Sequence, residues 1–192
     1  MFVGLSMLVY HYTDLVAGGS IIEDGYLKVS DRERQQGLKP SLWFSKQEIY
    51  EPSALKHYQT DSGISTFKTM QDQANMVGCV RFRYNDTDFN LHSWKEYGTL
   101  TGLARQTRRT MEKIHKKKGA RPSDWFCSFD YMKVEDMSSV EIWTDKWVEW
   151  TEENLESAMH KAEMLTMDGC EEDLSLIHIS EPTRPRLISY AV

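Results

Sequence analysis

The chain has 192 residues, with 23 Lys and Arg against 29 Asp and Glu, and a formal net charge of −6. This length indicates one domain with appended helices, and the negative charge argues against a chain that is basic throughout and binds nucleic acid for that reason. Cys79, Cys127 and Cys170 are widely spaced and form no CxxC pair. We therefore expect no metal, no disulfide framework and a cytoplasmic location.

The N-terminus lacks the basic region of a signal peptide, and no apolar run approaches the roughly 20 residues of a membrane-spanning helix. We therefore expect no membrane association. The end of the chain, "LSLIHISEPTR" from Leu174, resembles a translated sequencing adapter. We expect a single α+β domain over 1–150, a C-terminal helix over 151–173 and a non-native tail over 174–192, so His178 is not a site candidate.

The first half of the chain alternates strand and helix patterns. Residues 2–13 are rich in β-branched and aromatic residues and predict a strand, and the apolar positions after Leu15 predict a short helix that ends at Gly25. A buried strand is expected at 41–45, and Pro52 is placed to open a helix. A further helix is predicted over 66–76.

The second half begins with a strand pattern, "GCVRFRY" at 78–84, which puts Arg81 on one face and Phe82 on the other. A long helix is predicted from Leu91 to Lys118. Its apolar stripe is Leu100, Leu103, Ala104, Thr107, Met111 and Ile114. Aromatic strands are expected over 124–134 and 138–150, the latter with a turn at "TDK", and an amphipathic helix from Glu152. This order indicates a mixed α+β fold with a largely antiparallel sheet and a long basic amphipathic helix.

Polar residues gather where the predicted strands end. "YHYT" ends the first strand with His11, Tyr12 and Thr13, which offer an imidazole and two hydroxyls. Donors of this kind suit the ribose and base of a nucleotide. The second strand and its continuation supply Trp43, Ser45, Tyr50 and Glu51, and later strands supply Arg81 and Glu141. Whether these side chains converge is left open by the residues alone.

These residues also carry a resemblance. "VYHYTDLVAGGSIIEDGYLKVS…LWFSKQEIYEPSALK", "GARPSDWFCS" and "VEIWTDKWVEW" resemble a family of uncharacterised phage and bacterial proteins with "HYT…WFS…WEPTA" segments, over residues 8–150. That family is remotely similar to the ADP-ribosyltransferase fold. The resemblance implies NAD as substrate or ligand, with His11 on the nicotinamide ribose and Ser45 in the pocket wall. It also implies Glu141 as the carboxylate that stabilises the oxocarbenium-like transition state, with Glu51 as a rival carboxylate.

Three functions follow as hypotheses. The first is a phage or mobile-element protein of the host cytosol that transfers ADP-ribose from NAD, or that only binds a nucleotide. The second is a non-enzymatic inhibitor or sponge that captures a host defence protein or a signalling nucleotide. Six tryptophans could anchor such an interface, namely Trp43, Trp94, Trp125, Trp143, Trp147 and Trp150. The third, ranked last, is a nucleic-acid module that uses the basic residues of 105–121. A solvated face, partly neutralised by the acidic C-terminal segment, is the reading favoured for that helix.

Overall fold

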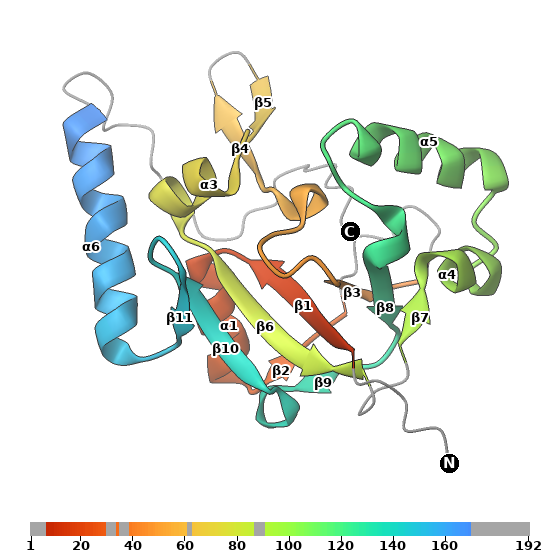
Figure 1. Cartoon of the computed structure of the whole chain (residues 1–192), viewed down its shortest axis with the longest axis horizontal. Helices are drawn as coiled ribbons and strands as arrows, with labels where there is room; N and C mark the ends of the chain where they lie inside the picture. Colours follow the sequence, from red (N-terminus) through yellow and green to blue (C-terminus); the bar gives the residue numbers. More distant parts are fainter. Residues whose placement is uncertain (1–6, 30–33, 35–38, 61–62, 87–90, 170–192) are drawn as a thin grey trace.

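In the computed structural model of the chain, a seven-stranded sheet with the spatial order β11-β10-β6-β1-β3-β8-β7 occupies the centre (Figure 1). The structure describes residues 7–29, 34, 39–60, 63–86 and 91–169, so the predicted tail at 174–192 lies outside the described residues. Every pairing within this sheet is antiparallel. The predicted α+β class with an antiparallel sheet is therefore confirmed. Its strands are β1 (Leu8–Thr13), β3 (Leu42–Ser45), β6 (Val80–Asn85), β7 (His92–Ser93), β8 (Trp125–Ser128), β10 (Ser139–Trp143) and β11 (Trp147–Glu149).

Two small sheets and several helices surround this sheet. The small sheets pair β2 (Tyr26–Leu27) with β9 (Met132–Lys133), and β4 (His57–Thr60) with β5 (Gly63–Thr66). The helices are α1 (Leu15–Asp24), α3 (Met70–Val77), α4 (Trp94–Leu100), α5 (Arg105–Lys116) and α6 (Glu152–Gly169). Short 3₁₀ turns, too brief to bury an apolar stripe of their own, are η1 (Pro52–Ala54), η3 (Pro122–Asp124) and η4 (Val134–Asp136).

Each face of the sheet has its own core, because successive residues of a strand point to opposite faces. On one face Val9, Phe44 and Phe82 are buried together beneath α1. Helix α1 lies close to this face, since a Cβ added at Gly18 would approach Val80 to 2.9 Å. On the other face a second core of buried, mostly aromatic residues packs beneath α4. This core comprises Trp43, Trp94, Tyr97, Ala120, Trp125 and Cys127. The two cores fix the sheet between layers, and the centre of the second face is left for polar groups.

The predicted single helix from Leu91 to Lys118 is wrong, because the chain forms two helices there. Ser93, the last residue of β7, caps α4 together with Glu96. Gly102 then adopts a φ of 70°, a left-handed conformation that ends a helix, before α5 begins at Arg105. The break also turns part of the predicted apolar stripe outward, whereas Leu103 and Met111 still pack against the second core.

The outward rotation is measurable at two of the stripe residues. Leu100 is 57% exposed and Ile114 is 44% exposed, whereas His115 is buried at 3%. The inner side of α5 is therefore formed by partly buried Met111 and buried His115, whose ring meets Trp125 edge to face at 5.6 Å.

Other predicted boundaries shift for local reasons. Gly25 ends α1 in the left-handed conformation, as predicted. Pro52 opens only a 3₁₀ turn. The helix predicted over 66–76 starts at Met70, because Thr69 forms its capping box. The strand predicted over 124–134 divides into β8 and β9, which belong to different sheets.

Candidate functional site

A small enclosed cavity lies between β1 and β3. These two strands share a single register pair, Tyr10 opposite Ser45, and a space opens beside it. The cavity admits about one water molecule in this conformation. It is lined by Tyr10, His11, Tyr12, Trp43, Phe44, Ser45, Glu51 and Ala54. The structure thus brings His11, Tyr12, Trp43, Ser45 and Glu51, all predicted site residues, around one space.

Glu51 is the carboxylate of this cavity, and it is only 1% exposed. Ser45 Oγ donates to its Oε2 at 2.7 Å, and Ser53 donates to its Oε1 from Oγ at 2.5 Å and from the backbone N at 3.1 Å. The same residue caps the turn η1. Hydrogen bonds of this kind stabilise a buried carboxylate, since a buried charge without partners is costly.

His11 lies at the inner side of the cavity, where its ring contacts the rings of Phe44 and Phe82. Its Nδ1 lies 2.9 Å from the carbonyl oxygen of Trp43. A carbonyl only accepts, so Nδ1 carries the proton and Nε2 is left as an acceptor. Burial lowers the pKa of His11 to about 4, so the imidazole is neutral at pH 7.

The residues 46–50, which we call the strap, cross the sheet above Tyr12. Tyr12 Oη donates to the carbonyl oxygens of Gln47 and Glu48, the latter at 3.2 Å. Arg81 Nη1 also donates to the Glu48 carbonyl, and Trp147 Nε1 donates to the Ile49 carbonyl at 2.9 Å. The strap is therefore held by side chains bonded to its backbone, while the Ile49 side chain is 72% exposed.

Arg81 and Glu141 form a buried ion pair that does not line the cavity. Arg81 Nε lies 2.6 Å from Glu141 Oε2, and the side chains are 7% and 16% exposed. The guanidinium lies between the rings of Tyr10 and Trp147, at 4.7 and 4.5 Å from the ring centroids. Cross-strand register explains the pairing, because Glu141 stands opposite Arg81. Both groups are thus occupied by protein partners.

The remaining predicted residues lie at the margins. Thr13 accepts from Lys56 Nζ at 3.4 Å, and Tyr50 packs edge to face on Tyr12 at 5.1 Å. Burial raises the pKa of the Tyr12 and Tyr50 phenols well above their ordinary value, so both remain protonated donors. Neither Thr13 nor Tyr50 lines the cavity.

Sequence reasoning missed two polar residues that support this region. Gln73 of α3 is fully buried, where its Oε1 accepts from the Lys56 backbone N at 2.8 Å and from Tyr50 Oη at 3.3 Å. Asp124 accepts from Gln47 Nε2 and so ties the start of the strap to η3, immediately before β8. A glutamine in a polar helix gives no sequence signal of burial. Asp124 carries a signal, since it is the polar first residue of the aromatic strand predicted over 124–134.

The described part of the chain holds no group of three or more His, Cys, Asp or Glu side chains arranged to bind a metal ion. Over the same residues, no helix has the length and apolarity to cross a bilayer. No protein-family model, curated protein or solved structure matches the chain.

Proposed function

We propose that the chain is a nucleotide-binding protein on an ADP-ribosyltransferase-like scaffold, and that it takes NAD into the cavity between β1 and β3. The observation that carries this proposal is the convergence of His11, Tyr12, Ser45 and Glu51, from three separate segments, on one space. An imidazole acceptor, two hydroxyls and a carboxylate are groups that hydrogen-bond ribose hydroxyls.

The closed cavity is too small for a dinucleotide, so binding requires the strap to move. The structure supports such a movement because the described bonds from β1, β6 and β11 reach strap carbonyls and not side chains. Releasing them leaves the strand pairings of the sheet intact. A nucleotide phosphate or amide can then take over donors such as Tyr12 Oη.

Transfer of ADP-ribose is the finer proposal for the same cavity, and Glu51 is the carboxylate that fits it. Cleavage of the nicotinamide–ribose bond builds positive charge on the ribose, which a fixed carboxylate stabilises in the transition state. Glu51 borders the space in which the ribose would lie, whereas Glu141 is paired with Arg81 outside it. The proposal therefore assigns the chemical role to Glu51, and to Glu141 a structural one.

Two measurements test this proposal, namely calorimetric titration of the full chain with NAD and mass spectrometry of nicotinamide release. We expect His11→Ala to weaken NAD binding at least about tenfold, and Glu51→Gln to lower release by about 10²–10³. Glu141→Gln is the matched control and should change neither by more than about twofold once folding is verified. No heat with NAD or with any adenine nucleotide would refute the proposal.

A second candidate is a non-enzymatic binder that sequesters the nucleotide. It is favoured by the fact that both oxygens of Glu51 already accept hydrogen bonds from protein groups, which suits holding a ligand more than reacting with it. In that case NAD binds with the expected His11 dependence and is recovered chemically unchanged. Nicotinamide release that depends on Glu51 excludes this alternative.

A further inference from the structure

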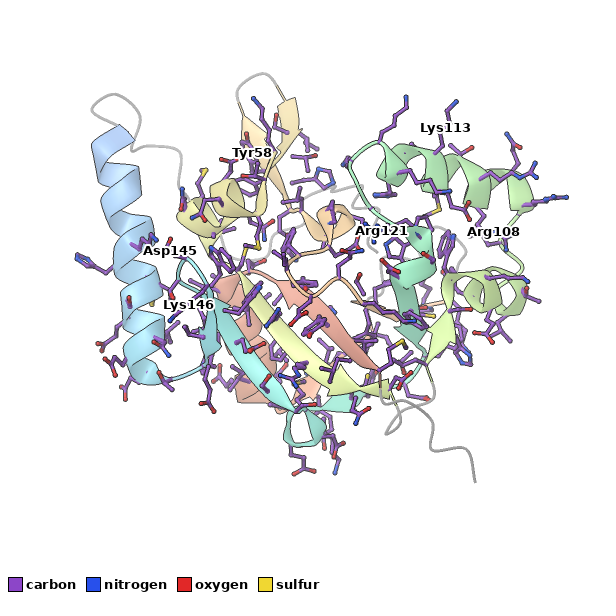
Figure 2. The ribbon with its side chains drawn as sticks, viewed as in Figure 1. Tyr58, Arg108, Lys113, Arg121, Asp145 and Lys146 are labelled. Carbon is purple, nitrogen blue, oxygen red and sulfur yellow. The ribbon has the colours of Figure 1, made fainter. Side chains whose placement is uncertain are left out.

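The basic residues of α5 and the loop that follows form a charged surface on a chain whose net charge is negative. Residues 105–121 carry Arg105, Arg108, Arg109, Lys113, Lys116, Lys117, Lys118 and Arg121 against the single acidic residue Glu112. Figure 2 shows Lys113, Arg108 and Arg121 on this side of the molecule, and Asp145 and Lys146 on the opposite side. The charge is thus concentrated and not spread evenly.

Within the described residues, most of this charge has no acidic partner. Glu112 is occupied, because it accepts from Trp94 Nε1 at 2.9 Å and lies 3.8 Å from Arg108 Nε. The sequence predicts partial neutralisation by the acidic C-terminal segment. The described part of that segment, α6, lies at the other end of the sheet from α5 (Figure 1), and its acidic residues after Gly169 lie outside the described residues. Within the described residues no ion pair joins a carboxylate to any of the other cations, which are Arg105, Arg109, Lys113, Lys116, Lys117, Lys118 and Arg121.

The cations are exposed and regularly spaced. Arg105, Arg109 and Lys113 follow one another at intervals of four residues, which puts them on one side of α5, about 6 Å apart along its axis. All three side chains are exposed. The helix is about 18 Å long, and duplex DNA carries one negative charge per about 1.7 Å, so about ten phosphates lie along that length and each cation has phosphates within reach.

A hollow continues this surface beside α5. It has a volume of about 510 Å³ and is bordered by cations from three elements, namely Lys95 of α4, Lys116 of α5 and Arg121 before η3. Ser93, Ser123 and the carboxylate of Glu112 also border it. A shallower hollow along the helix is lined by Arg109, Lys113, Lys116 and Lys117, again together with Glu112. Cations with hydroxyls around an open depression suit a sugar–phosphate backbone.

The described residues of this surface offer no exposed aromatic ring, and this decides which type of nucleic acid fits it. Trp94, the aromatic residue that borders the hollow, is only 4% exposed and packs in the second core. Among the described residues of 105–121 there is no aromatic ring except buried His115, whose pKa is lowered to about 4 by burial. Single-strand binders need exposed rings on which bases stack. We propose that α5 and the adjoining hollow bind the backbone of duplex nucleic acid without reading its sequence.

Fluorescence anisotropy of the full chain with a labelled duplex of about 20 base pairs, between 50 and 200 mM KCl, tests this proposal. If about five phosphates are contacted, log K should fall against log[KCl] with a slope of about −4.5. The triple variant Lys113/Lys116/Lys117→Gln should reduce this slope by about 3 and weaken binding at least tenfold at low salt. Circular dichroism verifies that the variant is folded.

Matched controls make the test decisive. The triple variant Lys28/Lys68/Lys146→Gln removes the same charge from exposed lysines elsewhere and should bind like the parent. DNA and RNA duplexes of equal length separate the two sources of the same backbone. The proposal is overturned if the parent fails to bind either duplex at 50 mM KCl, or if both triple variants weaken binding equally. It is also overturned if poly-glutamate or a single strand binds as tightly as the duplex.

Discussion

The ion pair between Arg81 and Glu141 allows a sharp test of whether Glu141 is structural. Removing its carboxylate leaves the Arg81 guanidinium buried at 6% exposure, and its remaining partners among the described residues are the Glu48 carbonyl, the Tyr12 hydroxyl and two aromatic rings. Arg81 cannot relieve this by losing its proton, since a guanidinium stays protonated in proteins. The folded state therefore bears the whole cost of the unpaired charge.

The size of the effect follows from burial. Breaking a buried ion pair by removing one partner costs about 3–5 kcal/mol of unfolding free energy, and the low exposure of both side chains puts this pair in that class. We expect Glu141→Ala to fall in that range. Glu141→Gln keeps an oxygen for Arg81 Nε and loses only the charge, so its cost should be about 1–2 kcal/mol.

Urea unfolding followed by tryptophan fluorescence measures both variants, because Trp147 packs on the guanidinium. A double-mutant cycle with Arg81→Met should give a coupling free energy of about 1–3 kcal/mol. Each single variant leaves one charge of the pair without its partner, whereas the double variant leaves neither charge. If Glu141→Ala costs less than about 1 kcal/mol, the pair behaves as a surface salt bridge and the structural role is wrong.

Three further outcomes can be measured by the same unfolding assay. Burial lowers the pKa of His115 in the folded state below its ordinary value of 6.5, so the unfolded chain binds the proton first and stability is lost as the pH falls below about 6.5. At pH 5 the loss of unfolding free energy should be about 2 kcal/mol. The variant His115→Gln should abolish that part of the pH dependence. Gly78→Ala should cost more than about 2 kcal/mol, because a φ of 71° disfavours Ala and the new Cβ would overlap the Leu15 side chain; an unchanged midpoint would contradict this. Thr69→Ala removes the bond to the Asp72 backbone N that caps α3 and should cost about 1 kcal/mol, whereas Thr69→Ser should be nearly neutral.

Local patterns predicted the elements that depend on neighbouring residues. The strand at 78–84 alternates because one face packs on the core, and the turn at "TDK" is present with Asp145 at a φ of 109°. The helix over 91–118 was mispredicted because its apolar spacing continues through Gly102, while the break depends on caps that outweigh that spacing. Ser93 and Glu96 carry the capping signal in the sequence, three residues apart.

The candidate site required information that no local pattern holds. Strand order decides which side chains meet, and "YHYT" gives no sign that β1 pairs with β3 on one side and β6 on the other. Which of Glu51 and Glu141 borders the cavity depends on strand register and on the turn that follows β3. Glu141 stands opposite Arg81, whereas Glu51 returns to Ser45 through a turn only six residues away. Convergence of His11, Ser45 and Glu51 was conceivable from sequence, but only the fold brings them together.

The placement of α5 and α6 at opposite ends of the sheet gives the molecule an electric dipole. The exposed acidic residues Glu152, Glu153 and Glu156 begin α6, and the basic run of α5 lies across the sheet from them (Figure 1). The net charge of −6 repels a polyanion at long range, while the dipole turns the basic end toward it. The molecule is therefore oriented before contact. This electrostatic orientation weakens once salt shortens the screening length to about 8 Å. Encounter rates with a polyanion should consequently be governed by ionic strength even where the final contacts are unchanged.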